Sequence, residues 1–122
     1  DKKTTNKIAE LLNAVASNTG SGYRAVIKGY DVAGKTGTAE MVVDGIYNKK
    51  GMKRTFFTGF VPVDKPKYIM AVMLDYPKKC YASWKPSLKI PCQGSNSAAV
   101  VFKDAMQSIL TNDSSIKLMA NK

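Results

Sequence analysis

The 122-residue sequence contains no histidine, and this absence removes several kinds of chemistry at once. Without histidine there is no Ser-His-Asp or Cys-His nucleophile system, no histidine general base and no histidine-ligated zinc. The two cysteines are too few for a four-thiolate metal site. The residues present therefore lead us to expect neither a metal nor a cofactor.

The sequence also lacks long apolar runs. No stretch of about 18 apolar residues is present, so no membrane span is expected within it. The chain begins Asp-Lys-Lys-Thr, without a methionine or the apolar segment of a signal peptide. We therefore interpret it as a piece of a longer protein.

Acidic residues are scarce, with 9 Asp and Glu against 19 Lys and Arg, for a net charge of +10. Such an excess invites nucleic acid as a partner. The lysines are scattered, however, and the only arginines are Arg24 and Arg54. Most aromatic residues lie in apolar runs, where a place in the core is the simpler explanation. We therefore expect no nucleic-acid binding, and a solvated basic surface instead.

Hydrophobic spacing predicts two helices that flank three strands. Apolar residues at helical spacing predict helices at Thr4–Ser17 and Ser95–Leu110. β-Branched and aromatic residues predict strands at Val32–Val43, Thr55–Val63 and Tyr68–Asp75. The connections between the strands are too short for helical crossovers, so the strands should pair antiparallel in sequence order. The predicted fold class is α+β, with this sheet packed against the N- and C-terminal helices.

The segments outside these elements carry three further expectations. Residues 48–53 should form a hairpin loop, residues 77–94 a long loop, and residues 111–122 a flexible tail. The run Tyr68–Leu74 is apolar without alternation, which favours burial on both faces of its strand. Two helices can cover one face, so the other needs a cover from a longer chain or from an oligomer.

The stretch from Gly29 to Thr36 matches G-x-x-x-x-G-K-[ST], the phosphate-binding loop. Such a loop leads from a strand into a helix, whose N-terminal amides face the phosphates. Here Gly37 and the β-branched residues up to the Asp44-Gly45 turn predict a strand instead. Nucleotide binding is therefore the less favoured alternative.

As a strand, Lys35-Thr36-Gly37-Thr38 has a clear chemical use. Alternation places Thr36 and Thr38 on one side, as two hydroxyl donors about 7 Å apart. Lys35 adds a positive charge, and Gly37 removes the side chain that would stop an extended ligand from lying along the strand edge. These features suit a peptide carboxylate bound by strand addition. They form a K-T-G motif of the kind found in penicillin-binding proteins and class A β-lactamases.

The stretch Gly29–Glu40 resembles the strand that carries the third active-site motif of class B penicillin-binding proteins. The two strands and the helix that follow resemble the family in order and spacing, so the resemblance covers about residues 4–110. The ending Thr-Ala-Glu and the stretch Met-Leu-Asp-Tyr-Pro-Lys favour the division-specific (septal) branch. The resemblance implies that residues 1–122 are an incomplete C-terminal fragment of a transpeptidase domain.

The family's other two motifs are absent. Its nucleophile lies in an S-x-x-K motif upstream of K-T-G and is followed by S-x-N, but this sequence has no S-x-N. Its one S-x-x-K, Ser114–Lys117, follows K-T-G and is in the wrong order. The resemblance therefore implies that this chain holds no nucleophile and is inactive alone.

The resemblance also assigns roles to the residues of the motif. Lys35 would lend positive charge to the substrate carboxylate and hold the serine of the missing S-x-N motif. The hydroxyls of Thr36 and Thr38 would bind that carboxylate, and the backbone N–H of Thr38 would form half of the oxyanion hole. Gly37 would let the acyl donor lie against the strand.

The implied function is serine acyl transfer by a peptidoglycan D,D-transpeptidase. The implied partners are stem peptides, β-lactam antibiotics, the rest of the transpeptidase domain and proteins of cell division. The implied location is the periplasmic face of the inner membrane, with the anchor outside this chain. Three alternatives remain open: an elongation-specific class B enzyme, a β-lactamase, and a stand-alone basic binding module without catalysis.

The two cysteines fit this implied compartment. Cys80 and Cys92 flank the loop between the last strand and the last helix. In an oxidising periplasm they could pair, and closing so short a loop stabilises a fold by ~3 kcal/mol in the chain-entropy model. Two free thiols are the alternative.

Overall fold

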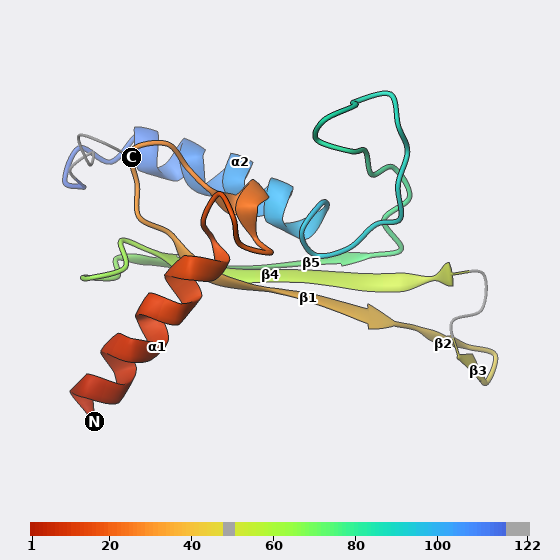
Figure 1. Ribbon diagram of the computed structural model, residues 1–122, viewed down its shortest axis with the longest axis horizontal. Coiled ribbons are helices and arrows are strands. Elements are labelled where there is room, and N and C mark those ends of the chain that lie inside the picture. The colour runs from red at the N-terminus through yellow and green to blue at the C-terminus, as the bar shows by residue number, and fades with distance from the viewer. Residues whose placement is uncertain (48–50, 117–122) are drawn as a thin grey trace.

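The computed structural model describes residues 1–47 and 51–116. In that part of the chain, three strands form an antiparallel sheet in the order β1-β4-β5 (Figure 1). The elements are α1 (Lys2–Val15), the 3-10 turn η1 (Tyr23–Ala25), β1 (Ala33–Glu40), β2 (Val42–Val43), β3 (Ile46–Tyr47), β4 (Lys53–Val61), β5 (Tyr68–Asp75) and α2 (Ala98–Thr111). The predicted α+β class and the sequential antiparallel pairing are confirmed.

The central strand β4 carries the side chains that join the sheet to α2. Phe57 and Val61 are fully buried and lie on one face of β4. Phe57 pairs with Thr36 of β1 on one side and with Val72 of β5 on the other. Residues opposite one another in an antiparallel pair point to the same face, so the side chain of Thr36 lies on the face that α2 covers.

Helix α2 covers this face with apolar residues that recur every three or four positions. Its buried residues are Ala98, Ala99, Phe102, Met106 and Leu110. The rings of Phe57 and Phe102 pack with their centroids 4.7 Å apart, at 54° to one another. Truncating such a buried Phe to Ala costs about 3–5 kcal/mol. This pair is the centre of the hydrophobic core.

Two glycines make room for these rings. A Cβ atom on Gly34 would lie 2.6 Å from Cζ of Phe57, and one on Gly59 would lie 2.9 Å from Cζ of Phe102. The glycine of Gly34-Lys35-Thr36 therefore serves packing. It lies within β1, and the strand continues to Glu40. The phosphate-loop interpretation needs a helix at that point, and the structure places none there.

Helix α1 starts earlier than predicted and packs lightly. The carboxylate of Asp1 accepts a hydrogen bond of 2.9 Å from Thr4 N, so Asp1 is the N-cap. The helix contacts β1, and the amide of Asn13 donates to Val32 O over 2.8 Å. No residue of α1 is buried, and Ile8 and Leu11 of its predicted apolar stripe are exposed. Neither α1 nor α2 is long and apolar enough to cross a bilayer, and the described residues contain no other α-helix.

The sheet face opposite α2 is open along β5. The side chains of this strand alternate between partly buried and exposed, and Ile69 and Met73 are 78% and 56% exposed. The sequence predicted burial on both faces of this run, with one face covered from outside this chain, and the described residues do leave that face uncovered. Because the helices do not cover these side chains, the apolar character of the open face is unexplained by contacts within the described residues.

The predicted first strand is divided in two. β1 ends at Glu40, and Met41 N donates to Met52 O before β2 begins. β2 pairs with β3 across Asp44 and Gly45, which have φ of 52° and 73°. Positive φ at both central positions is the geometry of a type I′ hairpin turn, as Asp-Gly predicts. Of the hairpin loop predicted at 48–53, residues 48–50 lie outside the described residues.

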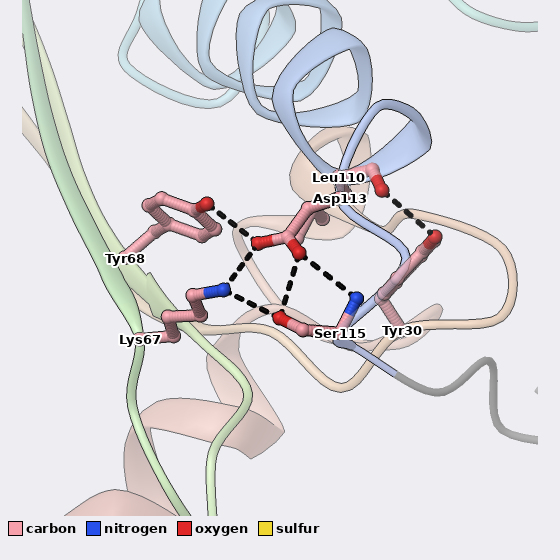
Figure 2. A network of polar contacts seen from close by, with 6 residues as sticks. All are labelled: Tyr30, Lys67, Tyr68, Leu110, Asp113 and Ser115. Carbon is pink, nitrogen blue, oxygen red and sulfur yellow. Dashed lines mark hydrogen bonds and ion pairs between the residues drawn. The ribbon is translucent and has the colours of Figure 1, made fainter.

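The chain after α2 is held against the start of β5 by a polar network (Figure 2). A carboxylate oxygen of Asp113 accepts hydrogen bonds of 2.6 Å from Lys67 Nζ and from the hydroxyl of Tyr68. Its second oxygen accepts from Ser115 N and Oγ. Ile116 also packs on the core. The first part of the predicted flexible tail thus has defined contacts, and residues 117–122 lie outside the described residues.

These contacts make Asp113 a pH-dependent stabiliser. Hydrogen bonds from Lys67, Tyr68 and Ser115 hold the pKa of the Asp113 carboxyl well below its usual range. A depressed pKa stabilises the fold above the unfolded-state value of about 3.9, and this contribution is lost as the pH falls further. Asp113→Asn should therefore lower the thermal midpoint at pH 7, by an amount that shrinks below about pH 4.

The matched control is Asp104→Asn, at an exposed position of α2. It should leave the midpoint nearly unchanged at every pH. Thermal scans between pH 2.5 and 7 test both variants, and an equal loss at pH 3 and pH 7 for Asp113→Asn would contradict the network.

Candidate functional site

Thr36, Gly37 and Thr38 of β1 form one wall of a small cavity at the edge of the sheet. The cavity has a volume of about 150 Å³. Its lining residues are Ser21, Thr36, Gly37, Thr38, Gln93, Gly94 and Ser95. Sites that enclose a whole small molecule measure about 300–1,000 Å³. This cavity fits one polar end of a ligand.

β1 presents its predicted residues in two directions. Thr36 and Thr38 pair with Phe57 and Thr55, so both threonines share the face that α2 covers. Lys35 lies on the other face, and its Nζ donates to the carbonyl oxygen of Thr36 over 2.9 Å. The structure therefore brings Thr36, Gly37 and Thr38 together around the cavity. The side chain of Lys35 lies on the opposite face of β1.

The opposite wall is the segment that leads into α2. Gly94 N donates to Thr38 Oγ1 over 3.0 Å. A Cβ atom on Gly94 would lie 2.5 Å from Gly37 O and 2.6 Å from Phe56 O. Only a glycine permits this approach of backbone to backbone, because any side chain would push the segment off β1.

Further hydrogen bonds fix this segment. Gln93 N donates to Asn96 Oδ1 over 2.7 Å, and the Asn96 amide donates to Pro91 O over 2.9 Å. The buried Ser97 Oγ lies 2.9 Å from Thr55 Oγ1 on β4. The wall is thus tied both to itself and to the central strand.

A disulfide closes the loop that precedes this wall. Cys80 and Cys92 are bonded, with a sequence separation of 12. Cys80 is buried and Cys92 half-buried. The bond lies one residue before Gln93, so it limits the movement of the chain that enters the cavity wall.

The arrangement suits binding more than chemistry. The wall offers two threonine hydroxyls, and Thr38 Oγ1 already accepts a hydrogen bond from Gly94 N. The hydroxyl proton of Thr38 can therefore be donated to a ligand oxygen. Among the residues that the structure describes, no titratable side chain lines the cavity. The described residues also contain no group of three or more His, Cys, Asp or Glu side chains that could hold a metal ion.

Sequence patterns did not identify the far wall. The other four lining residues come from two segments. Ser21 follows the first predicted helix, whereas Gln93, Gly94 and Ser95 span the end of the predicted loop and the start of the second helix. They reach the cavity only because α1 and α2 bring those segments to β1. A glycine just before the second helix was the available signal, since glycine often marks a close backbone approach.

Comparison with known proteins relates the whole chain to one family. Residues 1–107 match the family model described as penicillin binding protein transpeptidase domain. A curated relative, the peptidoglycan D,D-transpeptidase FtsI of Buchnera aphidicola, is 36% identical over 112 residues. The match covers 89% of this chain and 17% of that protein. A second relative, the probable peptidoglycan D,D-transpeptidase PenA of Neisseria flavescens, is 39% identical, over 61% of this chain and 18% of its own length. The chain thus spans less than a fifth of the length of these relatives.

Solved structures give the same relation. The crystal structure of penicillin binding protein 3 from Mycobacterium tuberculosis, complexed with ampicillin, matches with a TM-score of 0.75 and 27% identity. The match covers 98% of this chain and 26% of that one. The transpeptidase domain of the FtsI4 D,D-transpeptidase from Legionella pneumophila matches with a TM-score of 0.66 and 32% identity, over 89% and 36% of the two chains.

The two glycines of the cavity should respond differently to substitution. Gly94→Ala forces a Cβ atom against two carbonyl oxygens and should destabilise the fold by about 1–3 kcal/mol. Gly37→Ala is the matched control, because its Cβ atom would meet Phe56 at an ordinary 3.4 Å. Its effect on stability should stay within about 0.5 kcal/mol. Urea denaturation measures both, and equal losses would contradict the described approach of Gly94 to β1.

The pairing of Cys80 with Cys92 can be tested by mass spectrometry. Proteolysis of protein kept unreduced should release a peptide pair joined through Cys80 and Cys92, which mass spectrometry detects. Reduction before digestion should separate the two peptides. Two alkylated thiols under non-reducing conditions would refute the pairing.

Proposed function

Because the chain belongs to the penicillin-binding protein transpeptidase family and resembles its septal class B members, we propose that it is the C-terminal part of a peptidoglycan D,D-transpeptidase domain. The observation that carries this proposal is the convergence of Thr36 and Thr38 on a cavity fit for one carboxylate. The bound ligand would be a stem peptide or a β-lactam. The ampicillin complex of the mycobacterial homologue supports the second of these.

The wall of the cavity would bind the carboxylate of the ligand. Gly94 N holds Thr38 Oγ1 by donating to it, which leaves the hydroxyl proton to point at the ligand. The hydroxyl of Thr36, two residues earlier on the same face of β1, would donate the second hydrogen bond. Hydrogen bonds to a charged acceptor are worth about 1.5–3 kcal/mol each.

Lys35 would act through its charge. Its ammonium group is held by Thr36 O on the far side of β1, so it does not line the cavity. Its field would favour a carboxylate over a neutral group at Thr36 and Thr38. In the complete domain the same ammonium would also hold the serine of the missing S-x-N motif.

The reaction would divide between this chain and the rest of the domain. A serine outside this chain would attack the carbonyl carbon of the penultimate D-Ala, and the terminal D-Ala would leave with a proton on its amine. The N–H of Thr38 would bind the developing oxyanion together with the N–H of that serine. An amine of a neighbouring stem peptide would then displace the serine and form the cross-link.

The rest of the domain would supply what this chain lacks. The chain alone would have no activity, because it has neither the nucleophilic serine nor the S-x-N motif. The rest of the domain would cover the open face of β5, since the chain accounts for 26% of the mycobacterial structure. The whole protein would act at the periplasmic face of the inner membrane with other cell-division proteins. FtsI and PenA among the relatives favour the division branch over the elongation branch.

Labelling with a fluorescent penicillin tests the roles of the motif in the complete protein. Lys35→Ala and Thr38→Val should each slow acylation by at least about tenfold. The first removes the positive charge that favours the carboxylate, and the second removes a hydrogen bond to it. Thr58→Val is the matched control for the hydroxyl. Thr58 is an exposed threonine directly opposite Lys35 on β4 and lies outside the cavity.

The control variant should be labelled at the rate of the unmodified protein. The isolated 122-residue chain should take no label at any concentration. Normal labelling of both motif variants would remove the assignment of the K-T-G strand, and covalent labelling of the isolated chain would show that it holds a nucleophile of its own.

A further inference from the structure

The loop between β5 and α2 is a short hairpin closed by the disulfide, and we call residues 80–92 the disulfide hairpin. Tyr81 and Lys89 form an isolated antiparallel bridge. Ala82 N donates to Leu88 O and Ile90 N donates to Cys80 O, each over 2.9 Å. Figure 1 shows the segment projecting from the end of the sheet at which β1 stops.

The base of the hairpin is fixed to the body of the molecule. An Arg24 Nη2 donates to Tyr81 O over 2.7 Å, and the hydroxyl of Tyr23 donates to Ser83 Oγ over 3.1 Å. Arg24 also lies over the ring of Tyr23, 5.6 Å from its centroid. With the disulfide, these contacts hold both arms of the hairpin and leave its tip pre-organised.

The tip exposes apolar and basic side chains together. Trp84 is 76% exposed and Leu88 41% exposed. Residues 76–103 contain five lysines and no acidic residue, and the four in the loop are Lys78, Lys79, Lys85 and Lys89. All four are exposed, and none forms an ion pair within residues 1–47 and 51–116. A tryptophan exposed on a fixed support is the side chain that most often anchors a binding surface.

The hairpin continues directly into the cavity wall. Cys92 is followed by Gln93, Gly94 and Ser95, which line the cavity with Thr36 and Thr38. A polymeric ligand whose carboxylate sits in the cavity would therefore have the hairpin close to its bound end. The charge of the hairpin is opposite to that of a ligand with several carboxylates.

We propose that the disulfide hairpin is an accessory binding site for an anionic glycopeptide strand of the polymeric substrate. The indole of Trp84 stacks on the apolar face of a sugar ring, and the lysines pair with carboxylates of the attached peptides. This proposal rests on the proposed function, because it takes the substrate polymer from it. It adds a second contact that a small β-lactam does not make.

The experiment compares binding and acylation in the complete protein. Binding to purified peptidoglycan sacculi is measured by co-sedimentation, and acylation is measured with a fluorescent penicillin. Trp84→Ala and the double variant Lys85→Ser with Lys89→Ser are tested separately. The matched controls are Tyr47→Ala, an exposed aromatic on β3, and Lys28→Ser with Lys65→Ser, an equal loss of charge at exposed positions.

Each hairpin variant should weaken sacculus binding by at least about fivefold, while penicillin acylation stays within about twofold of the unmodified protein. The controls should change neither quantity. Binding by the unmodified protein should also fall as the salt concentration rises, because exposed charges carry part of it.

In the sacculus and acylation assays, three results would overturn the proposal: unchanged sacculus binding in both hairpin variants, an equal loss in the control variants, or a loss of acylation that parallels the loss of binding. Vesicles of neutral phospholipid with one fifth anionic phospholipid give a further arm. Trp84-dependent binding to these vesicles, with no binding to sacculi, would assign the hairpin to a membrane surface instead and overturn the proposal. If the unmodified protein is not acylated, the proposed function fails. That outcome is distinguishable from a failure of the hairpin proposal, because sacculus binding is measured in a separate assay.

Discussion

The packing of Phe57 against Phe102 joins the central strand to the C-terminal helix, and the cavity wall that precedes this helix depends on it. The two rings are fully buried with centroids 4.7 Å apart. They reach each other because Gly34 and Gly59 have no side chains in their way. This contact sets the height of α2 above the sheet, and the segment just before α2 is then brought down onto β1. Gly94 can donate to Thr38 only because that height is fixed.

The same arrangement supports the proposal that this chain binds a ligand and leaves the reaction to the rest of the domain. Two hydroxyls, backbone amides and a cation behind the strand are all groups that stabilise negative charge, and they need no proton transfer of their own. A nucleophile and a base are different requirements and would come from other residues of the domain. In the proposed acyl-transfer site, the wall that would receive the substrate carboxylate is therefore separate from the groups that would break the bond. The absence of histidine fits such a division, because nothing in this wall has to titrate near neutral pH.

The sequence predicted local features of the structure but not the contacts between segments that are far apart in the chain. The β-branched and aromatic residues of Thr55–Val63 and the Asp44-Gly45 turn are local patterns, and the structure has β4 and a hairpin turn there. The placement of Thr36 and Thr38 on one face of a strand also follows from local alternation. The helix start at Lys2 was missed because Asp1 caps it, whereas hydrophobic spacing placed the start at Thr4. The far wall of the cavity was missed for another reason. Apart from the glycine, nothing in Gln93-Gly94-Ser95 indicates a contact with β1, and only packing of α2 brings these residues there.

A crystal structure of the complete protein acylated by a penicillin would show whether Thr36 and Thr38 bind the carboxylate of the ligand. We expect that carboxylate to lie within about 3.2 Å of both hydroxyl oxygens, with Gly94 N still donating to Thr38. A carboxylate placed elsewhere, with the two threonines facing only water, would rule out this role for the threonines.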